Sequence, residues 1–133
     1  MAQHIAQFAL VVDEYDRAIA WYTGKLGFTV VEDTALNDDK RWVLLAPKGS
    51  TGCRVLLARA ASPEQMKAIG NQTGGRVFLF LHTDDFMGDY ANLKGHHVEF
   101  VREAEQQPWG MVAVFRDLYG NLWDLVEATV ADR

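Results

Sequence analysis

The chain has 133 residues, of which 49% are hydrophobic and 23% charged, and it carries a formal net charge of −5. This size and composition predict one soluble globular domain that can bury a sizeable core. The acidic balance argues against a nucleic-acid partner, which needs a basic surface, and no apolar run is long enough to span a membrane. With one cysteine, Cys53, and no secretory signal, we expect a cytoplasmic protein without an intrachain disulfide.

The first half of the chain predicts a strand, a helix and three further strands. An apolar run ends at Asp13-Glu14, where a carboxylate can satisfy free N–H groups at the start of a helix. The helix has an apolar stripe at spacings of three and four, and Gly27 suits its end. The residues of the stripe are Tyr15, Ala18, Tyr22 and Leu26. The expected strands are Ile5–Val12, Thr29–Asp33, Arg41–Ala46 and Arg54–Ala58.

A short helix and a glycine-rich hinge are expected next. Ser62-Pro-Glu-Gln has the pattern of a capping box, with Ser62 as N-cap, Pro63 at the first helical position and Gln65 reaching back. The helix is expected to run to Gly70, and residues 71–75 to form the hinge. This predicts a first module over residues 4–59, a connection over 60–75 and a second module over 76–128.

The second module repeats the first about 70 residues later, which marks a duplicated supersecondary unit. Phe78-Leu-Phe-Leu-His leads to Asp84-Asp85, and either aspartate can cap a helix with Phe86, Tyr90 and Leu93 on its inner face. The expected strands are Arg76–Thr83, Val98–Arg102, Trp109–Phe115 and Leu122–Glu127. Each module therefore reads βαβββ.

Two segments carry a family resemblance. Arg17-Ala-Ile-Ala-Trp-Tyr followed by Leu26-Gly-Phe, and Asp117-Leu-Tyr-Gly-Asn-Leu-Trp-Asp-Leu, resemble the vicinal oxygen chelate superfamily of glyoxalase I, bleomycin-resistance proteins and extradiol dioxygenases. The second segment is similar to the family's Asp-Pro-x-Gly-Asn-x-x-Glu-Leu, with Leu118 where proline usually stands. The resemblance implies an α+β fold in which two βαβββ modules form a curved mixed sheet around a cavity. It also implies a homodimer.

In metal-dependent members of that superfamily, four inward positions bind one divalent ion. The spacing from the acidic caps and from Gly52 and Gly120 places them here at Gln7, Leu56, Phe78 and Asp124. Only Gln7 and Asp124 offer oxygen ligands, whereas a divalent cation needs several. We therefore expect no metal and no other cofactor. A divalent metal held by Gln7 and Asp124 remains the alternative.

Side chains alternate along a strand, so these four positions predict the other residues on the inner face. That face is mostly apolar and aromatic, as expected for a small-molecule pocket. The residues predicted to bind a ligand are Gln7, Arg54, Leu56, Phe78, Phe80, Trp42 and Trp109. Asp124 and His82 are the candidate catalytic groups. Alternatively, Asp124 pairs with Arg54, and His82 binds the turn at Asp84-Asp85.

These residues leave three functions open. The first is a binding protein of the bleomycin-resistance type, which holds a small, partly apolar or aromatic molecule without a metal. The second is a metal-dependent lyase, isomerase or dioxygenase that uses Gln7 and Asp124. The third is metal-free catalysis by Asp124 or His82 on a substrate with an acidic C–H bond.

Overall fold

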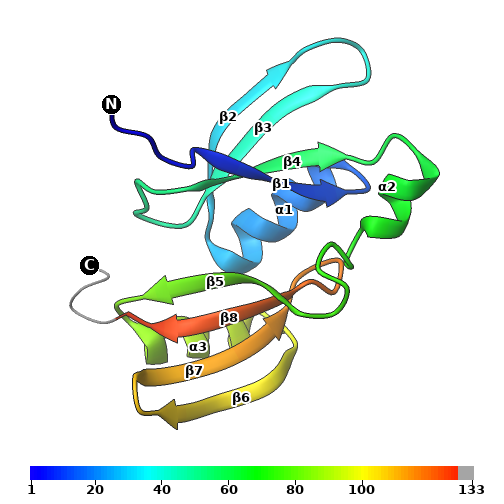
Figure 1. Ribbon diagram of the computed structural model, residues 1–133. Coiled ribbons are helices and arrows are strands. Elements are labelled where there is room, and N and C mark those ends of the chain that lie inside the picture. The colour runs from blue at the N-terminus through cyan, green and yellow to red at the C-terminus, as the bar shows by residue number, and fades with distance from the viewer. Residues whose placement is uncertain (129–133) are drawn as a thin grey trace. The chain divides into compact units, whose positions relative to one another are not determined.

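The computed structural model describes residues 1–128, and the chain divides into two compact units, Met1–Ile69 and Gly70–Arg133. The division falls just before the predicted hinge. Each unit holds one four-stranded mixed sheet (Figure 1). The α+β class and the βαβββ order of both modules are confirmed. Within residues 1–128, no helix is long and apolar enough to cross a membrane.

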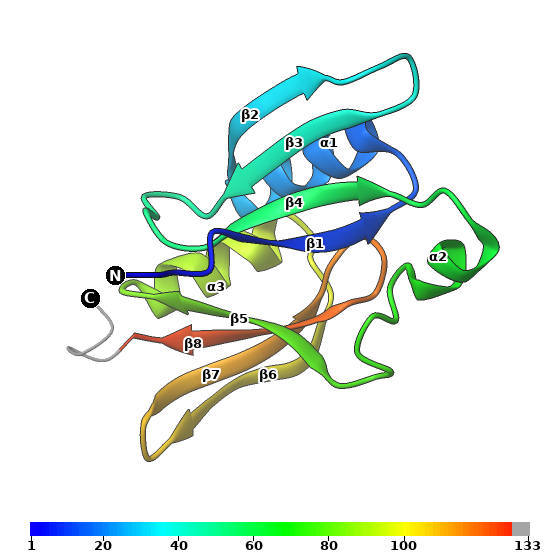
Figure 2. The same cartoon turned by 45° about the horizontal axis from the view of Figure 1, so that its top comes forward.

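The first unit packs one long helix on one face of its sheet. The strand order is β1-β4-β3-β2, with β1 parallel to β4 and the other neighbours antiparallel. The helix α1 (Tyr15–Leu26) lies against β3 and β4, and the short α2 (Pro63–Ala68) follows the sheet (Figures 1 and 2). The strands are β1 (Gln7–Val12), β2 (Thr29–Ala35), β3 (Arg41–Ala46) and β4 (Arg54–Arg59).

The second unit has the same topology. Its order is β5-β8-β7-β6, again with one parallel pair, β5 with β8. The helix α3 (Phe86–Gly95) lies over one face and contacts β8. The strands are β5 (Val77–Thr83), β6 (Phe100–Gln107), β7 (Gly110–Arg116) and β8 (Leu122–Glu127).

The largest error in the predicted strands concerns β6 and β7. The strand expected to end at Arg102 continues to Gln107, and Trp109, expected to begin a strand, lies in a turn. Gln107 pairs with Gly110, so Pro108 and Trp109 form a two-residue connection. Gly110 has φ 134, a conformation that favours glycine over other residues. Residues 103–107, which are polar except for Ala104, carry no apolar alternation, because they belong to an edge strand.

The helix starts differ in detail from the expected caps. At α1 the Asp13 carboxylate accepts the Glu14 N–H at 2.6 Å, while Glu14, the N-cap residue, makes no side-chain cap. At α3 Asp85 accepts the Gly88 N–H, as predicted for this turn. At α2 Ser62 accepts the N–H of Gln65 at 3.2 Å, but the Gln65 side chain accepts from Ala61 rather than from Ser62.

Alternating side chains give each sheet one buried and one open face. In both units the buried face packs against the helix. On this face the buried strand residues of the first unit are Leu10, Val12, Val43, Leu45, Val55 and Leu57. On the same face of the second unit they are Ala113, Phe115, Trp123 and Leu125. The central strands β3 and β7 also bury residues of the opposite face, namely Leu44, Ala46, Val112 and Val114. Trp123 stacks on Phe115, with 5.8 Å between ring centroids, as expected for a residue under the helix.

The turn before β8 is closed by Asp117, which is only 6% exposed. Its carboxylate accepts the N–H groups of Tyr119 and Asn121, the Asn121 side-chain amide and the Trp123 indole N–H, all within 3.1 Å. Close packing also brings Gly70 to this turn, because a Cβ on Gly70 would lie 2.1 Å from the Tyr119 carbonyl oxygen. The Asp-x-x-Gly-Asn segment is therefore a structural clamp.

Candidate functional site: a hollow on the open face of the second sheet

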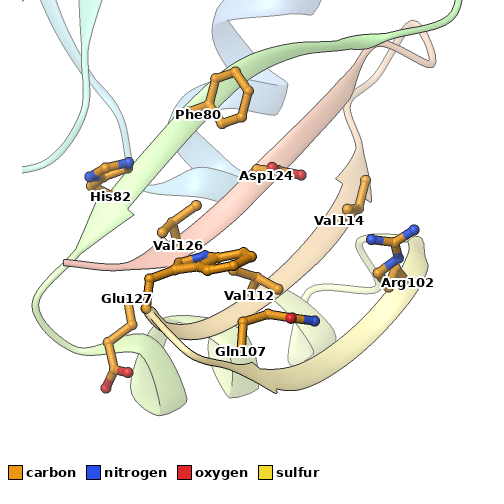
Figure 3. A pocket seen from close by; sticks show the side chains of 10 residues that line it. Phe80, His82, Arg102, Gln107, Val112, Val114, Asp124, Val126 and Glu127 are labelled. Carbon is orange, nitrogen blue, oxygen red and sulfur yellow. The ribbon is translucent and has the colours of Figure 1, made fainter. Parts of the chain in front are cut away.

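The open face of the β5–β8 sheet carries a hollow of about 520 Å³, within the size range of small-molecule pockets (Figure 3). All four strands contribute to it. Its apolar and aromatic lining residues are Phe80, Trp109, Val112, Val114 and Val126. Its polar lining residues are His82, Arg102, Gln107, Asp124 and Glu127.

Valines form the floor of the hollow. Val112 pairs with Val126 across β7 and β8, and Val114 lies two residues further along β7 on the same face. Val114 is only 8% exposed. Branched side chains of this kind pack closely on a pleated surface. The floor is therefore flat and apolar, and it offers contact area without hydrogen-bond partners.

Two aromatic side chains border this floor while remaining open to solvent. Phe80 on β5 is 63% exposed, and Trp109 in the β6–β7 turn is 60% exposed. Aromatic rings of this size normally bury much of their surface. Two such rings at the edge of one hollow are suited to cover the faces or edges of a planar ligand.

A row of four residues crosses the sheet next to this floor. Phe80 pairs with Asp124, Asp124 pairs with Val114, and Val114 pairs with Arg102. The row therefore runs from an aromatic ring through a carboxyl group and an apolar side chain to a guanidinium group, and all four side chains surround the hollow (Figure 3).

Burial raises the pKa of the Asp124 carboxyl group, and the positive charge of Arg102 opposes that rise in pKa. Desolvation is the larger of the two effects. The sequence suggested Arg54 as the partner of Asp124, but the cation that acts on this carboxyl group within its own unit is Arg102. A carboxyl group with a raised pKa in a hollow is a common feature of functional sites.

Arg102 was missed from the sequence because β6 contains register shifts on both sides of it, between Phe100 and Arg102 and between Arg102 and Glu105. A bulge of this kind re-aims a side chain and breaks the simple alternation. No signal in the sequence marks its position. Gln107 was missed for a related reason, since it lies in the unexpected extension of β6.

The remaining polar groups of the hollow differ in the contacts that they already make within the protein. Glu127 accepts the Met111 N–H at 3.0 Å, so its carboxylate is already engaged in holding the β6–β7 hairpin. His82 pairs with Val126 in the ladder and lines the hollow together with Asp124. The two candidate catalytic residues are thus brought to one site.

Phe78 does not line this hollow. It lies at a register shift in β5, between Val77 and Leu79, where the ladder with β8 is interrupted. The shift changes the side-chain alternation that placed Phe78 beside Phe80 in the sequence. Ligand binding by Phe78 stays a prediction.

The other predicted site residues belong to the first unit. Gln7 pairs with Arg54, and both line a second hollow of about 470 Å³ at the starts of β1 and β4. Leu56 lies further along β4, and Trp42 lies on β3, and neither lines this second hollow. These four residues therefore belong to the first sheet, whereas Asp124 belongs to the second.

The donor atoms do not suit a family-type metal site. Of the four expected positions, Leu56 and Phe78 have no oxygen or nitrogen in their side chains. Gln7 supplies one amide oxygen from the first sheet, and Asp124 one carboxylate from the second. Within residues 1–128, no three histidine, cysteine, aspartate or glutamate side chains are grouped as a metal site requires. Two oxygen donors do not replace the hydration shell of a divalent ion.

A family model for the Glyoxalase/Bleomycin resistance protein/Dioxygenase superfamily matches residues 4–125. An uncharacterized protein of Shewanella frigidimarina is 56% identical over 128 residues, covering 96% of this chain and 95% of that protein. YetH of Bacillus subtilis, also uncharacterized, is 30% identical over 129 residues, covering 96% of this chain and 100% of YetH.

Two solved structures share the fold over nearly the whole chain. UcmS2 has a TM-score of 0.82 and 29% identity, and the match covers 96% of this chain and 100% of UcmS2. TnmS3, an antibiotic binding protein from Streptomyces sp. CB03234, has a TM-score of 0.76 and 27% identity, with 96% and 98% covered.

Proposed function

The chain belongs to the glyoxalase/bleomycin resistance protein/dioxygenase superfamily, and from that premise we propose that it is a binding protein for a small, partly apolar or aromatic molecule. The ligand lies in the hollow on the open face of the β5–β8 sheet. Binding uses no family-type metal centre. The observation that carries this proposal is an apolar valine floor bordered by the exposed rings of Phe80 and Trp109.

The energetics of that surface support binding. Covering apolar area yields about 25 cal/mol per Å², and an aromatic contact in good geometry adds roughly 0.5–1.5 kcal/mol. The valine floor supplies area, while Asp124 and Arg102 at the edge of the floor supply orientation. The similarity to TnmS3, an antibiotic binding protein, supports the same class of function. Because one fold serves many functions, the residues of the hollow carry more weight than this likeness.

The test is a fluorescence titration with a panel of planar aromatic and purely aliphatic compounds. We expect the aromatic compounds to quench the emission of Trp109, and Trp109→Phe to abolish that response. Trp42→Phe is the matched control, since Trp42 lies on β3 of the other unit, and it should keep the quenching. A panel that leaves the emission of wild-type protein unchanged would contradict the proposal.

Metal independence has its own test. Purified protein is incubated in turn with Ni²⁺, Co²⁺, Mn²⁺, Fe²⁺ and Zn²⁺, dialysed and analysed for bound metal. We expect less than one equivalent of each ion, because two of the four family positions lack donor atoms. One tightly bound ion per chain that is lost in Asp124→Ala and in Gln7→Ala would favour the glyoxalase-like lyase, isomerase or dioxygenase instead.

A second candidate function is metal-free proton transfer. It is favoured by the raised pKa of Asp124 and by the presence of His82 in the same hollow. The check is deuterium exchange into a set of carbon acids in D₂O, followed by NMR. Exchange that survives a chelator but is lost in Asp124→Asn or His82→Ala would establish it, and no exchange above background would exclude it for that set.

We also propose that the chain forms a homodimer, as the family resemblance implies. The edge strands β2 and β6 expose the side chains of Val30, Val31 and Val101, which association between copies would cover. Sedimentation velocity should show a species of two chains. A single-chain species at all micromolar concentrations would contradict the dimer without affecting the binding proposal.

A further inference from the structure

We infer that the ligand of the hollow is an acidic aromatic compound, with an anionic oxygen group held by Arg102 and a hydrogen-bond donor facing Asp124. This inference rests on the proposed binding function and adds the chemical class of the ligand. Its basis is a guanidinium group that lies at the hollow and forms no ion pair with a carboxylate of residues 1–128.

Four of the seven arginines within residues 1–128 form ion pairs with carboxylates. They are Arg17, Arg41, Arg59 and Arg116. Among residues 1–128, no carboxylate forms an ion pair with Arg102, although the chain holds 18 acidic residues against 13 basic ones. A guanidinium fork left open beside an apolar floor is suited to a carboxylate, which it can bind through two parallel hydrogen bonds.

Asp124 does not serve as the missing partner. Val114 separates the two residues in the ladder, so Asp124 and Arg102 stand two strands apart, with roughly 10 Å between their Cα atoms at ordinary strand spacing. The field of Arg102 reaches Asp124, but no ion pair between them forms in the described structure. A ligand can therefore fill the space over Val114, with opposite polar ends at the two residues.

The fold does not dictate a positive charge at the position of Arg102. The first sheet has the same register shift on its edge strand, and there Glu32 pairs with Leu44 as Arg102 pairs with Val114. The bulge therefore turns a charged residue toward the row in both units, yet the sign of the charge differs. The cation at this place is a property of the second sheet's sequence, as expected if it recognises an anion.

The experiment uses two probes that differ only in charge, 6-hydroxy-2-naphthoate and 6-hydroxy-2-naphthamide. Both have a flat ring system and a distant hydroxyl group that can donate to Asp124. Isothermal titration calorimetry at pH 7 and low salt should show the acid binding about 10–100-fold more tightly than the amide, which is the usual range for a charge-assisted hydrogen-bond pair.

Arg102→Gln should remove this preference while leaving the affinity for the amide within about 3-fold, because a rim charge adds little to neutral contacts. Arg76→Gln is the matched control: Arg76 is also exposed and belongs to the same unit but lies outside the hollow. This control should keep the preference. Circular dichroism of each variant verifies that the sheet is intact, and Arg102→Lys, which keeps the charge, should retain part of the preference.

Two results would overturn the inference. Equal affinity of wild-type protein for the acid and the amide, or a preference that survives in Arg102→Gln, would show that no anion is bound by Arg102, while aromatic binding itself would stand. Failure of both probes to bind wild-type protein would count against the acidic class and against the proposed function together.

Discussion

The two sheets share a row of four matched positions but differ in the chemistry placed on it. In the first sheet the row consists of Ala9, Leu56, Leu44 and Glu32. In the second sheet it consists of Phe80, Asp124, Val114 and Arg102. The strand order, the parallel pair and the bulge before the last residue of the row are the same in both.

The comparison separates what the fold supplies from what single residues supply. The fold supplies an open face and a frame that aims four side chains at it. In the first sheet small and aliphatic residues fill three of the four positions, so the row offers no aromatic contact. In the second sheet the same positions carry an aromatic ring and two charges, and a hollow surrounds them. Four substitutions therefore distinguish the row of the candidate binding site from its counterpart in the first sheet.

The largest expected effect concerns the turns that precede the closing strands. Asp117→Ala should lower the free energy of unfolding by about 2–4 kcal/mol, because it leaves buried N–H donors without an acceptor. In the first unit the equivalent turn is exposed, and Ser50 accepts only the Gly52 N–H at 3.1 Å. Ser50→Ala is the matched control, with an expected change below about 0.5 kcal/mol. Urea unfolding monitored by circular dichroism measures both, and equal effects would show that the two turns are equally clamped.

The next effect comes from giving the second row the residues of the first. The triple variant Phe80→Ala, Asp124→Leu and Arg102→Glu should bind 6-hydroxy-2-naphthoate at least about 100-fold more weakly, since it loses one aromatic contact and the anion-binding fork. Calorimetric titration gives the affinity. Glu32→Gln, in the first row, is the control and should bind as wild type does. Unchanged affinity in the triple variant would place the binding surface elsewhere.

The hairpin turns offer a smaller test. Gly110→Ala should cost about 1–3 kcal/mol, because alanine disfavours the positive φ. The added Cβ would also lie 3.0 Å from the Glu127 carboxylate. Gly24 lies late in α1, and no atom lies near the position of its missing Cβ. Its substitution by alanine should therefore change stability in the opposite direction. Gly24→Ala should stabilise by about 0.5–1 kcal/mol. Thermal unfolding of both variants checks the signs, and stabilisation by Gly110→Ala would contradict the assigned turn.

The smallest expected effect is the pH dependence of stability at Asp124. Burial raises the folded-state pKa of this carboxyl group above the ordinary value of 3.8. Below pH 3.8 both states are protonated and no penalty applies. As pH rises through 3.8 and then through the raised folded pKa, the unfolded state ionises first and stability is lost. Asp124→Asn should therefore raise the melting temperature at pH 7 and leave it unchanged at pH 3.

Asp33 provides the opposite case in the first unit. Its hydrogen bonds to Arg41 lower the pKa of its carboxyl group. The folded state therefore ionises first, so this group stabilises above the ordinary pKa and the stabilisation is lost as pH falls through the lowered folded value. Asp33→Asn should lower the melting temperature at pH 7. If the melting temperatures of Asp124→Asn and Asp33→Asn at pH 7 both rose or both fell, the raised pKa of Asp124 or the lowered pKa of Asp33 would be contradicted.

Simple alternation predicted a substantial part of the candidate site. It placed Phe80, His82 and Asp124 on one face of the second sheet, and these three residues do surround one hollow. The duplicated βαβββ order and the closing strand Leu122–Glu127 also followed from the sequence. In each case a local pattern of apolar residues and turn residues contained enough information.

The remaining part depends on contacts between distant segments. Arg102 reaches the hollow because its strand bulges against β7, and Phe78 lies outside it because β5 shifts against β8. Bulges arise from strand pairing, which a single segment does not encode. The turn at Trp109 was misplaced because the edge strand before it is polar on both faces. Ligand binding and catalysis by the predicted residues stay predictions until the experiments above are done.

The close approach of Gly70 to the Tyr119 carbonyl oxygen has a practical consequence for dividing the chain into halves. Any side chain at residue 70 would push this backbone contact apart, so the segment that joins the repeats is anchored by its first residue. Four residues later, around Gly74, nothing crowds the backbone. A cut at that point would leave Gly70 with the first half, so permuted or split versions of the protein should instead be opened before Gly70, where the second half keeps this residue and its contact with the Tyr119 turn.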